Sequence, residues 1–104
     1  MIRVSVLYPT KEGSKFDWDY YTKTHMPLVR ERFAGALVKD EIDRGLGTAE
    51  PGAPAPFQVV AHLSFNSMDD VQKAMGAHGP ELMADIPNYT DMQPLFQISE
   101  VAVS

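Results

Sequence analysis

The sequence contains no cysteine, which removes several classes of chemistry at once. Disulfides, thiolate nucleophiles and cysteine-ligated zinc or iron-sulfur centres are excluded, and a reducing compartment is compatible with this composition. Long hydrophobic runs are also lacking, since no window approaches the roughly 20 apolar residues that a membrane helix needs. The first segment, MIRVSVLYPT, alternates in polarity and does not have the pattern of a signal peptide. We therefore expect a cytoplasmic protein that does not bind membranes.

Positive charge is scarce as well. Nine Lys and Arg residues stand against 14 Asp and Glu, which gives a formal net charge of -5 and a pI near 5.0. This balance argues against a nucleic-acid or anionic-membrane surface. No glycine-rich phosphate loop and no G-x-S-x-G segment occur, so nucleotide chemistry and serine hydrolysis have no support. The three histidines lack metal-ligand spacing, and we expect neither a metal nor another cofactor.

The residues that are present predict one α+β domain over residues 1–104. With 104 residues and 44% apolar content, the chain is long enough for one modest core. Period-two alternation predicts four strands, and period-3.6 patterns predict two helices between them. The predicted strands lie in residues 2–7, 36–46, 57–65 and 94–103, and the helices in residues 17–33 and from 67 onward. This order is the split βαβ arrangement of ferredoxin-like folds, a four-stranded antiparallel sheet with two helices on one face.

Two prolines are expected to interrupt the helices. Pro27 cannot donate to the carbonyl of Lys23, so we expect a kink or a restart near residues 24–26 of the first helix. In the second helix, Ser67 and Asp70 form a capping box, and Pro80 is expected to divide the helix into two parts.

One face of the predicted sheet has no helix to cover it. The alternation places five side chains there or close to it: Leu7, Leu37, Val60, His62 and, with a bulge in the last strand, Val101. A mixed polar and apolar sheet face is most simply covered by its own copy under two-fold symmetry. We therefore expect a homodimer that forms through the open sheet face.

A resemblance to a known family runs through LYP, FDWDYYTKTHMPL, HLSFNSMDDVQKAM and DIPNYTDMQPLFQISEV, and so spans nearly the whole chain. In these segments the sequence resembles the EthD family of dimeric α+β barrel proteins. It implies a ferredoxin-like subunit whose sheet stacks on that of its partner, with a pocket between sheet and helices and His25 as a catalytic residue. The family is named after ethyl tert-butyl ether degradation, and similar proteins are tied to polyketide tailoring and dehydration. The wider superfamily includes cofactor-free monooxygenases, muconolactone isomerases and haem-binding enzymes, so haem on His25 is an alternative by analogy.

His25 is the main candidate for proton transfer. It follows Tyr21 and Asp17 at steps of four on the apolar side of the first helix, where the three side chains could share hydrogen bonds. An imidazole tuned by burial acts as a base or an acid near neutral pH. Tyr21 is the second catalytic candidate, since a phenol stabilises developing negative charge on a carbonyl oxygen. The alternative is that His25 only packs and donates to a backbone carbonyl.

Four further aromatic residues are predicted to contact a ligand. Tyr8 and Tyr89 offer phenols, while Trp18 and Phe65 would line an apolar pocket, although each is also a normal core residue. The sequence thus favours an enzyme that acts on a small apolar carbonyl or aromatic compound by dehydration, isomerisation or cofactor-free oxygenation. Two alternatives stay open: a non-catalytic carrier or accessory protein of a monooxygenase-linked degradation pathway, and a purely structural dimer without a cavity.

Overall fold

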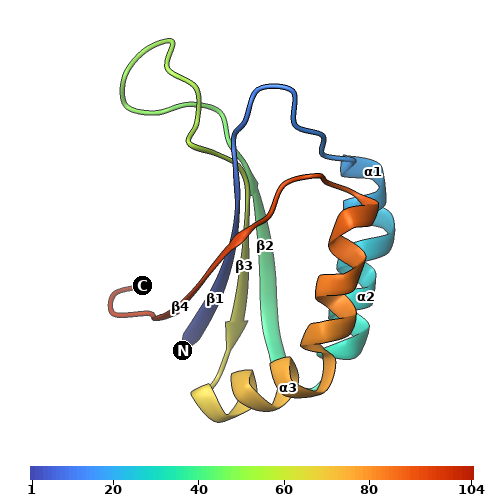
Figure 1. Cartoon of the computed structure of the whole chain (residues 1–104). Coiled ribbons are helices and arrows are strands. Elements are labelled where there is room, and N and C mark those ends of the chain that lie inside the picture. Colours follow the sequence, from blue (N-terminus) through green and yellow to red (C-terminus); the bar gives the residue numbers. More distant parts are fainter.

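The computed structural model describes residues 1–104 and shows a four-stranded antiparallel sheet with the helices on one face (Figure 1). The strand order is β2-β3-β1-β4, which confirms the predicted ferredoxin-like α+β fold. In chain order the elements are β1 (Ile2–Pro9), α1 (Trp18–Tyr20), η1 (Tyr21–His25), α2 (Met26–Arg32), β2 (Leu37–Arg44), β3 (Phe57–Phe65), α3 (Met68–Asp85), η2 (Ile86–Asn88) and β4 (Leu95–Glu100). None of these helices combines the length and the apolar composition that a membrane-spanning segment requires.

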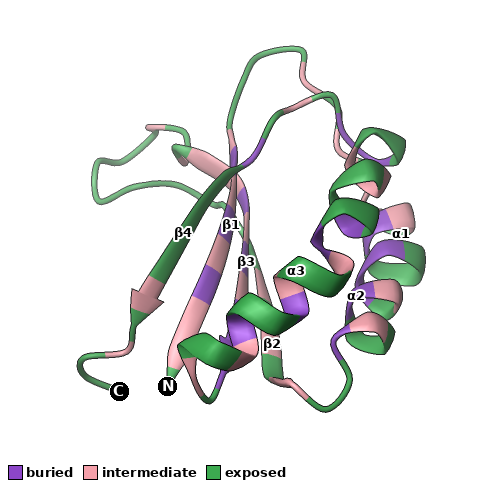
Figure 2. Cartoon of the chain, turned by 60° about the horizontal axis from the view of Figure 1, so that its bottom comes forward, coloured by how far each residue is buried: buried purple, intermediate pink, exposed green.

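The core lies between the two central strands and the helices. Val4 and Val6 of β1 pair with Leu63 and Ala61 of β3, and all four side chains are buried on the helical side. In Figure 2 the purple, buried positions of α2 and α3 face this sheet, whereas β4 is mostly green. The alternation that predicted the strands therefore also predicted which face is covered.

The first helical run is continuous but contains a π-helical turn. Asp17 caps its start, since its side chain accepts from the Tyr20 amide. The five residues of η1 then form a wider turn, in which the Met26 amide donates to the Tyr21 carbonyl five residues before it. This turn ends at His25, two residues before Pro27, so the irregularity overlaps the predicted region, residues 24–26. The helix does not restart.

The second helix corrects a prediction. Pro80 does not divide it, because α3 runs without a break from Met68 to Asp85. The residue before the proline is Gly79, which has no Cβ for the proline ring to meet, so one of the usual clashes is absent. The predicted cap at Ser67 is present, with its Oγ accepting from the Asp70 amide at 3.1 Å.

Two strands also differ from their patterns. In β2 the register shifts between Leu37 and Lys39, so that Val38 is an extra, half-exposed residue and Leu37 turns to pack against the core. The prediction that Leu37 lies on the open face is therefore wrong. The last strand ends at Glu100, short of the predicted residue 103, and Val103 is exposed.

Leu7, Val60 and His62 lie on the sheet face without helices, as predicted. Leu7 pairs with Val60 on one side and with Leu95 on the other, so these three apolar side chains form a row across β3, β1 and β4. His62 is near them and bonds Asp43 on β2, with 2.9 Å between Nε2 and Oδ2. The open face is therefore part apolar and part charged.

Candidate functional site

His25 lies inside the protein at the end of the π-helical turn. Only 6% of the residue is exposed, and its ring stacks on Tyr21 with 5.5 Å between ring centroids. The Tyr89 ring is closer still, at 4.6 Å. An imidazole enclosed in this way is removed from bulk water, so the groups that contact its two nitrogens decide its protonation.

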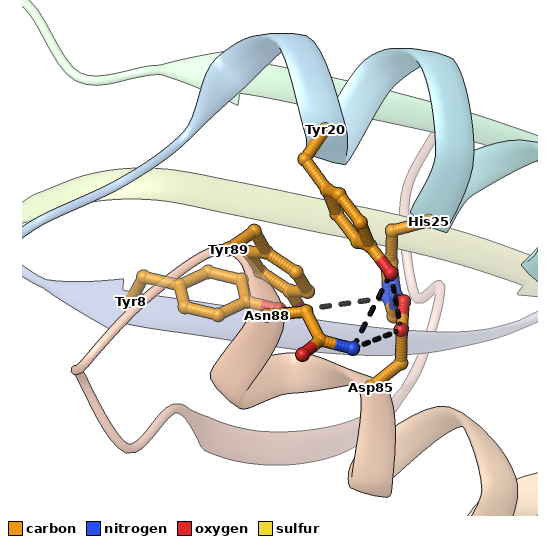
Figure 3. Close-up of polar contacts among 6 residues, drawn as sticks. All are labelled: Tyr8, Tyr20, His25, Asp85, Asn88 and Tyr89. Carbon is orange, nitrogen blue, oxygen red and sulfur yellow. Dashed lines mark hydrogen bonds and ion pairs between the residues drawn. The ribbon is translucent and has the colours of Figure 1, made fainter.

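Asp85, the last residue of α3, binds one of those nitrogens. Its Oδ2 is 2.8 Å from Nδ1 of His25. Its Oδ1 accepts from the Tyr20 hydroxyl at 2.6 Å and from Nδ2 of Asn88 at 2.9 Å. Figure 3 shows these three side chains converging on the carboxylate from α1, η1 and η2. Because α3 continues through Pro80, the carboxylate reaches the histidine.

The second nitrogen of His25 faces a pair of phenols. A carboxylate only accepts, so Nδ1 carries the proton toward Asp85 and Nε2 keeps the lone pair that accepts a hydrogen bond. The Tyr89 hydroxyl is 3.4 Å from Nε2 and 2.6 Å from the Tyr8 hydroxyl. In this tautomer Tyr89 donates to Nε2 and Tyr8 donates to Tyr89. The basic atom of the imidazole therefore has only one long, weak hydrogen bond.

Burial sets the charge state of this network. Burial lowers the pKa of His25 below its ordinary value, and the hydrogen bond and charge of Asp85 oppose that shift only in part. For Asp85, burial acts to raise the pKa, but the hydrogen bonds from Tyr20, His25 and Asn88 outweigh it and lower the pKa. At neutral pH the pair is thus a carboxylate beside a neutral imidazole, which is the form that accepts a proton.

The phenols are held in their protonated form. Burial raises the pKa of Tyr8 to about 12. It also raises the pKa values of Tyr21 and Tyr89, and neighbouring phenols and carboxylates act in the same direction. These hydroxyls therefore remain hydrogen-bond donors across the physiological range, as the stabilisation of an oxyanion requires.

An apolar cavity of about 50 Å³ adjoins the network, between the sheet, α2 and α3. His25, Tyr8 and Tyr21 are part of its wall, together with aliphatic residues and methionines of both layers. Pockets for larger ligands usually hold about 300–1,000 Å³. The cavity therefore admits only part of a ligand in this conformation.

The structure brings four of the six predicted site residues together and leaves two apart. Tyr8, Tyr21 and Tyr89 contact one another, and His25 contacts Tyr21 and Tyr89. Phe65 is fully buried against Phe33 at the far end of β3 and does not line the cavity. Trp18 also lies outside it, half-buried beneath the guanidinium of Arg44 at 4.3 Å. The predicted contact of these two residues with a ligand has no support in the geometry.

The predicted carboxylate partner of His25 was wrong. Asp17 uses its Oδ1 to cap the helix at the Tyr20 amide, and the bond to the imidazole comes from Asp85. One feature of the sequence points to this carboxylate. Asp85 opens the DIPNYTD segment, which also contains the site candidate Tyr89.

Neither a metal nor haem fits these residues. No group of three His, Asp or Glu side chains is placed to bind a metal ion. A haem iron would need to approach Nε2 of His25, since Nδ1 bonds Asp85, but the Tyr89 hydroxyl lies 3.4 Å from Nε2. The cavity is also far smaller than the macrocycle.

Comparison with known proteins agrees with this architecture. A family model described as the EthD domain matches residues 12–93. An EthD-like protein from Ralstonia eutropha JMP134 is 41% identical, with 99% of this chain and 93% of that chain covered, at a TM-score of 0.92. An EthD family protein from Bacillus halodurans C-125 is 22% identical, with 96% and 97% covered, at a TM-score of 0.68.

A more distant structure shares the fold alone. SnoaB, a cofactor-independent oxygenase from Streptomyces nogalater, is 9% identical, with 99% of this chain and 93% of that chain covered, at a TM-score of 0.62. No curated protein matches the chain. The family model covers most of the sequence, and the chain belongs to the EthD family.

Proposed function

We propose that this protein binds a small apolar carbonyl or aromatic compound beside His25 and moves a proton with that residue. The observation that supports this most directly is the 2.8 Å contact between His25 and Asp85 at the wall of an apolar cavity. Buried Asp-His pairs fix the imidazole tautomer and stabilise the imidazolium that forms when the base takes a proton. Here the pair leaves Nε2 as the base.

The proposed step is removal of a proton from the carbon next to a carbonyl. Nε2 of His25 takes the proton, the electron pair of the C–H bond moves into the enolate, and the negative charge develops on the carbonyl oxygen. Tyr21 donates to that oxygen, since it lines the cavity and keeps its proton, or Tyr8 does so once its bond to Tyr89 is broken. Dehydration, isomerisation and cofactor-free oxygenation all begin with this abstraction, in degradative or polyketide-type metabolism.

The test is hydrogen exchange on a small ketone. The substrate is 3-methyl-2-butanone in heavy water. Proton NMR follows the hydrogens on the carbon atoms next to its carbonyl, whose signals disappear as deuterium replaces them. His25→Gln keeps a hydrogen-bonding side chain but removes the base, so the catalysed exchange should fall by about 10²–10⁴-fold. His78→Gln is the matched control, because that histidine lies outside the cavity wall. Exchange that survives in His25→Gln would exclude the base assignment.

A second candidate is a non-catalytic carrier or accessory protein of a monooxygenase-linked pathway. One observation favours it, because Tyr89 already lies 3.4 Å from Nε2, so the imidazole has no free basic atom until a ligand displaces that contact. In this case ketones bind beside His25, and neither the wild type nor His25→Gln exchanges their protons.

We also propose that two copies pair through the open sheet face in the cytoplasm. The row formed by Leu7, Val60 and Leu95 supports this, since an apolar row on an exposed sheet is stabilised by burial against a second surface.

A further inference from the structure

A second hollow adjoins the cavity at His25. It is a groove of about 490 Å³ that runs along η2 and the following segment, residues 90–94, to the edge strand β4. The cavity and the groove share three wall residues, Met83, Ile86 and Phe96. Met83 is 50% exposed and Phe96 is 43% exposed, so these two side chains lie where the cavity meets the groove.

The two hollows differ in size and polarity. The cavity is almost entirely apolar and holds about three to five water-sized groups, at roughly 10–15 Å³ for each. The groove is about ten times larger, and polar residues such as Thr90 and Gln93 contribute to its wall. A molecule that occupies both must therefore have a compact apolar end and a larger, more polar remainder.

Charge limits the ligand further. Neither hollow has a Lys or Arg in its wall, and the one charged residue in either wall is Asp91, in the groove. Asp85 adds a second carboxylate behind His25. An anionic group in the groove would thus lie near the Asp91 carboxylate with no cation to pair with, which is unfavourable.

We infer that the ligand of this site is a neutral two-part molecule. Its apolar end, the size of a small branched alkyl group, enters the cavity beside His25, and its polar remainder lies in the groove over residues 90–94. Met83 and Phe96 lie at the entrance to the cavity and limit the size of the apolar end that can enter it. The inference rests on the proposed function in one respect, the position of the ligand's carbonyl group next to His25.

The test uses matched keto amides and keto acids. The probes are 5-methyl-4-oxohexanamide, which has an isopropyl end, its carboxylate analogue, and 4-(1-adamantyl)-4-oxobutanamide. Binding to the full chain is followed by ¹H-¹⁵N NMR titration. The isopropyl amide should shift amide signals of residues 82–96, and both the carboxylate and the adamantyl amide should bind at least about tenfold more weakly.

Three variants assign these preferences to the two hollows. Met83→Trp should abolish binding of the isopropyl amide, whereas Met68→Trp, on the same helix but in neither wall, should leave it unchanged. Gln93→Lys should bring the affinity of the carboxylate up toward that of the amide. Equal affinity for amide and carboxylate in the wild type, or isopropyl amide binding that survives Met83→Trp, would overturn the inference.

The inference and the proposed function can fail separately. If the isopropyl amide binds as described but His25 does not exchange its protons, the ligand class stands and the proton-transfer role falls. If His25 exchanges the protons of the adamantyl and isopropyl amides equally well, the proton transfer stands and the two-part site falls.

Discussion

At the scale of single residues, Asp85 connects the chemistry of the site to its stability. The carboxylate accepts hydrogen bonds from three side chains, and only 13% of its own side chain is exposed. Hydrogen bonds to a charged group contribute more than those between neutral groups, and the loss is largest where water cannot replace them. Asp85 is a positioning residue, because it acts on a ligand only through His25.

Replacing Asp85 should lower the stability of the protein and change the pKa and tautomer of the His25 imidazole. In Asp85→Asn we expect the free energy of unfolding to fall by about 1.5–3 kcal/mol. The pKa of His25 should fall further, because the carboxylate is what opposes the effect of burial. ¹⁵N NMR of the ring should show that the preference for the Nδ1–H tautomer is lost.

Asp17→Asn is the matched control for this variant. It keeps a side-chain oxygen for the helix cap and should leave the ring signals of His25 unchanged. An unaltered tautomer in Asp85→Asn, or an altered one in Asp17→Asn, would contradict the assignment of the carboxylate.

Acid should destabilise the protein through His25. The folded-state pKa of His25 lies below the unfolded value of 6.5, so below pH 6.5 the unfolded chain binds more protons than the folded one. The contribution is fully present above that pH and decreases as the pH falls toward the folded pKa. Asp85 adds a further loss below pH 3.8, since its folded pKa is also lowered.

Thermal unfolding between about pH 7 and about pH 5 measures this contribution. The melting temperature of the wild type should fall more steeply over this interval than that of His25→Gln. Parallel slopes for the two proteins would mean that His25 is not buried in its neutral form.

The sequence could predict that His25 belongs to the site, but it could not predict which carboxylate contacts the imidazole. His25 and Tyr21 follow from residue type and helical spacing, and Tyr8 and Tyr89 from residue type alone. Asp85 is 60 residues from His25, and no local period relates them. The spacing of four from Asp17 to Tyr21 to His25 assumes a regular α-helix, whereas the structure has a π-helical turn there and uses Asp17 as a cap.

At the scale of elements, the two prolines within helical segments affect the backbone differently. Pro27 follows a π-helical turn, while Pro80 lies in the middle of α3 with no break. A proline removes one backbone donor in both places, so the difference lies in what surrounds the ring. A side chain precedes Pro27, whereas Gly79 precedes Pro80. Propensity alone could not predict this, because packing on the sheet holds α3 together across the gap.

Pro80→Ala should therefore stabilise the protein. Pro80 is exposed, and alanine would restore the missing donor in the helix interior, where proline is about 3 kcal/mol less favourable than alanine. Urea denaturation should show an increase in the free energy of unfolding of up to that size. Pro51→Ala, in the loop between β2 and β3, should show no such gain. A loss of stability in Pro80→Ala would mean that the sheet packs only against a helix bent by proline.

At the scale of the whole molecule, the sequence predicted the layers well and the edges poorly. Alternation in β1 and β3 fixes the buried face, because a shift of one residue would turn every apolar side chain to the wrong side. The bulge at Val38 and the early end of β4 depend on backbone geometry that no pattern records. The volume of the cavity depends on how side chains pack in three dimensions, so it too was beyond the sequence.

The exposed apolar surface of the sheet leads to a prediction about assembly. Leu7, Val60 and Leu95 form a row on the face that no helix covers, and Leu95 is 55% exposed. Burial of such a row contributes roughly 25 cal/mol per Å² of apolar surface, so a second copy is stabilised there. Light scattering at micromolar concentration should report a dimer.

A charge in the middle of that row should separate the copies. In Leu7→Arg the guanidinium would be buried at the interface with the apolar side chains of Val60 and Leu95 as its cross-strand neighbours, so the protein should become a monomer. Met68→Arg, on the helical side, should remain a dimer. Because Leu7 faces away from the core, the His25 ring signals should be unchanged in Leu7→Arg, which separates loss of the interface from loss of the fold. A wild-type protein that is already monomeric would exclude the sheet face as an interface between copies.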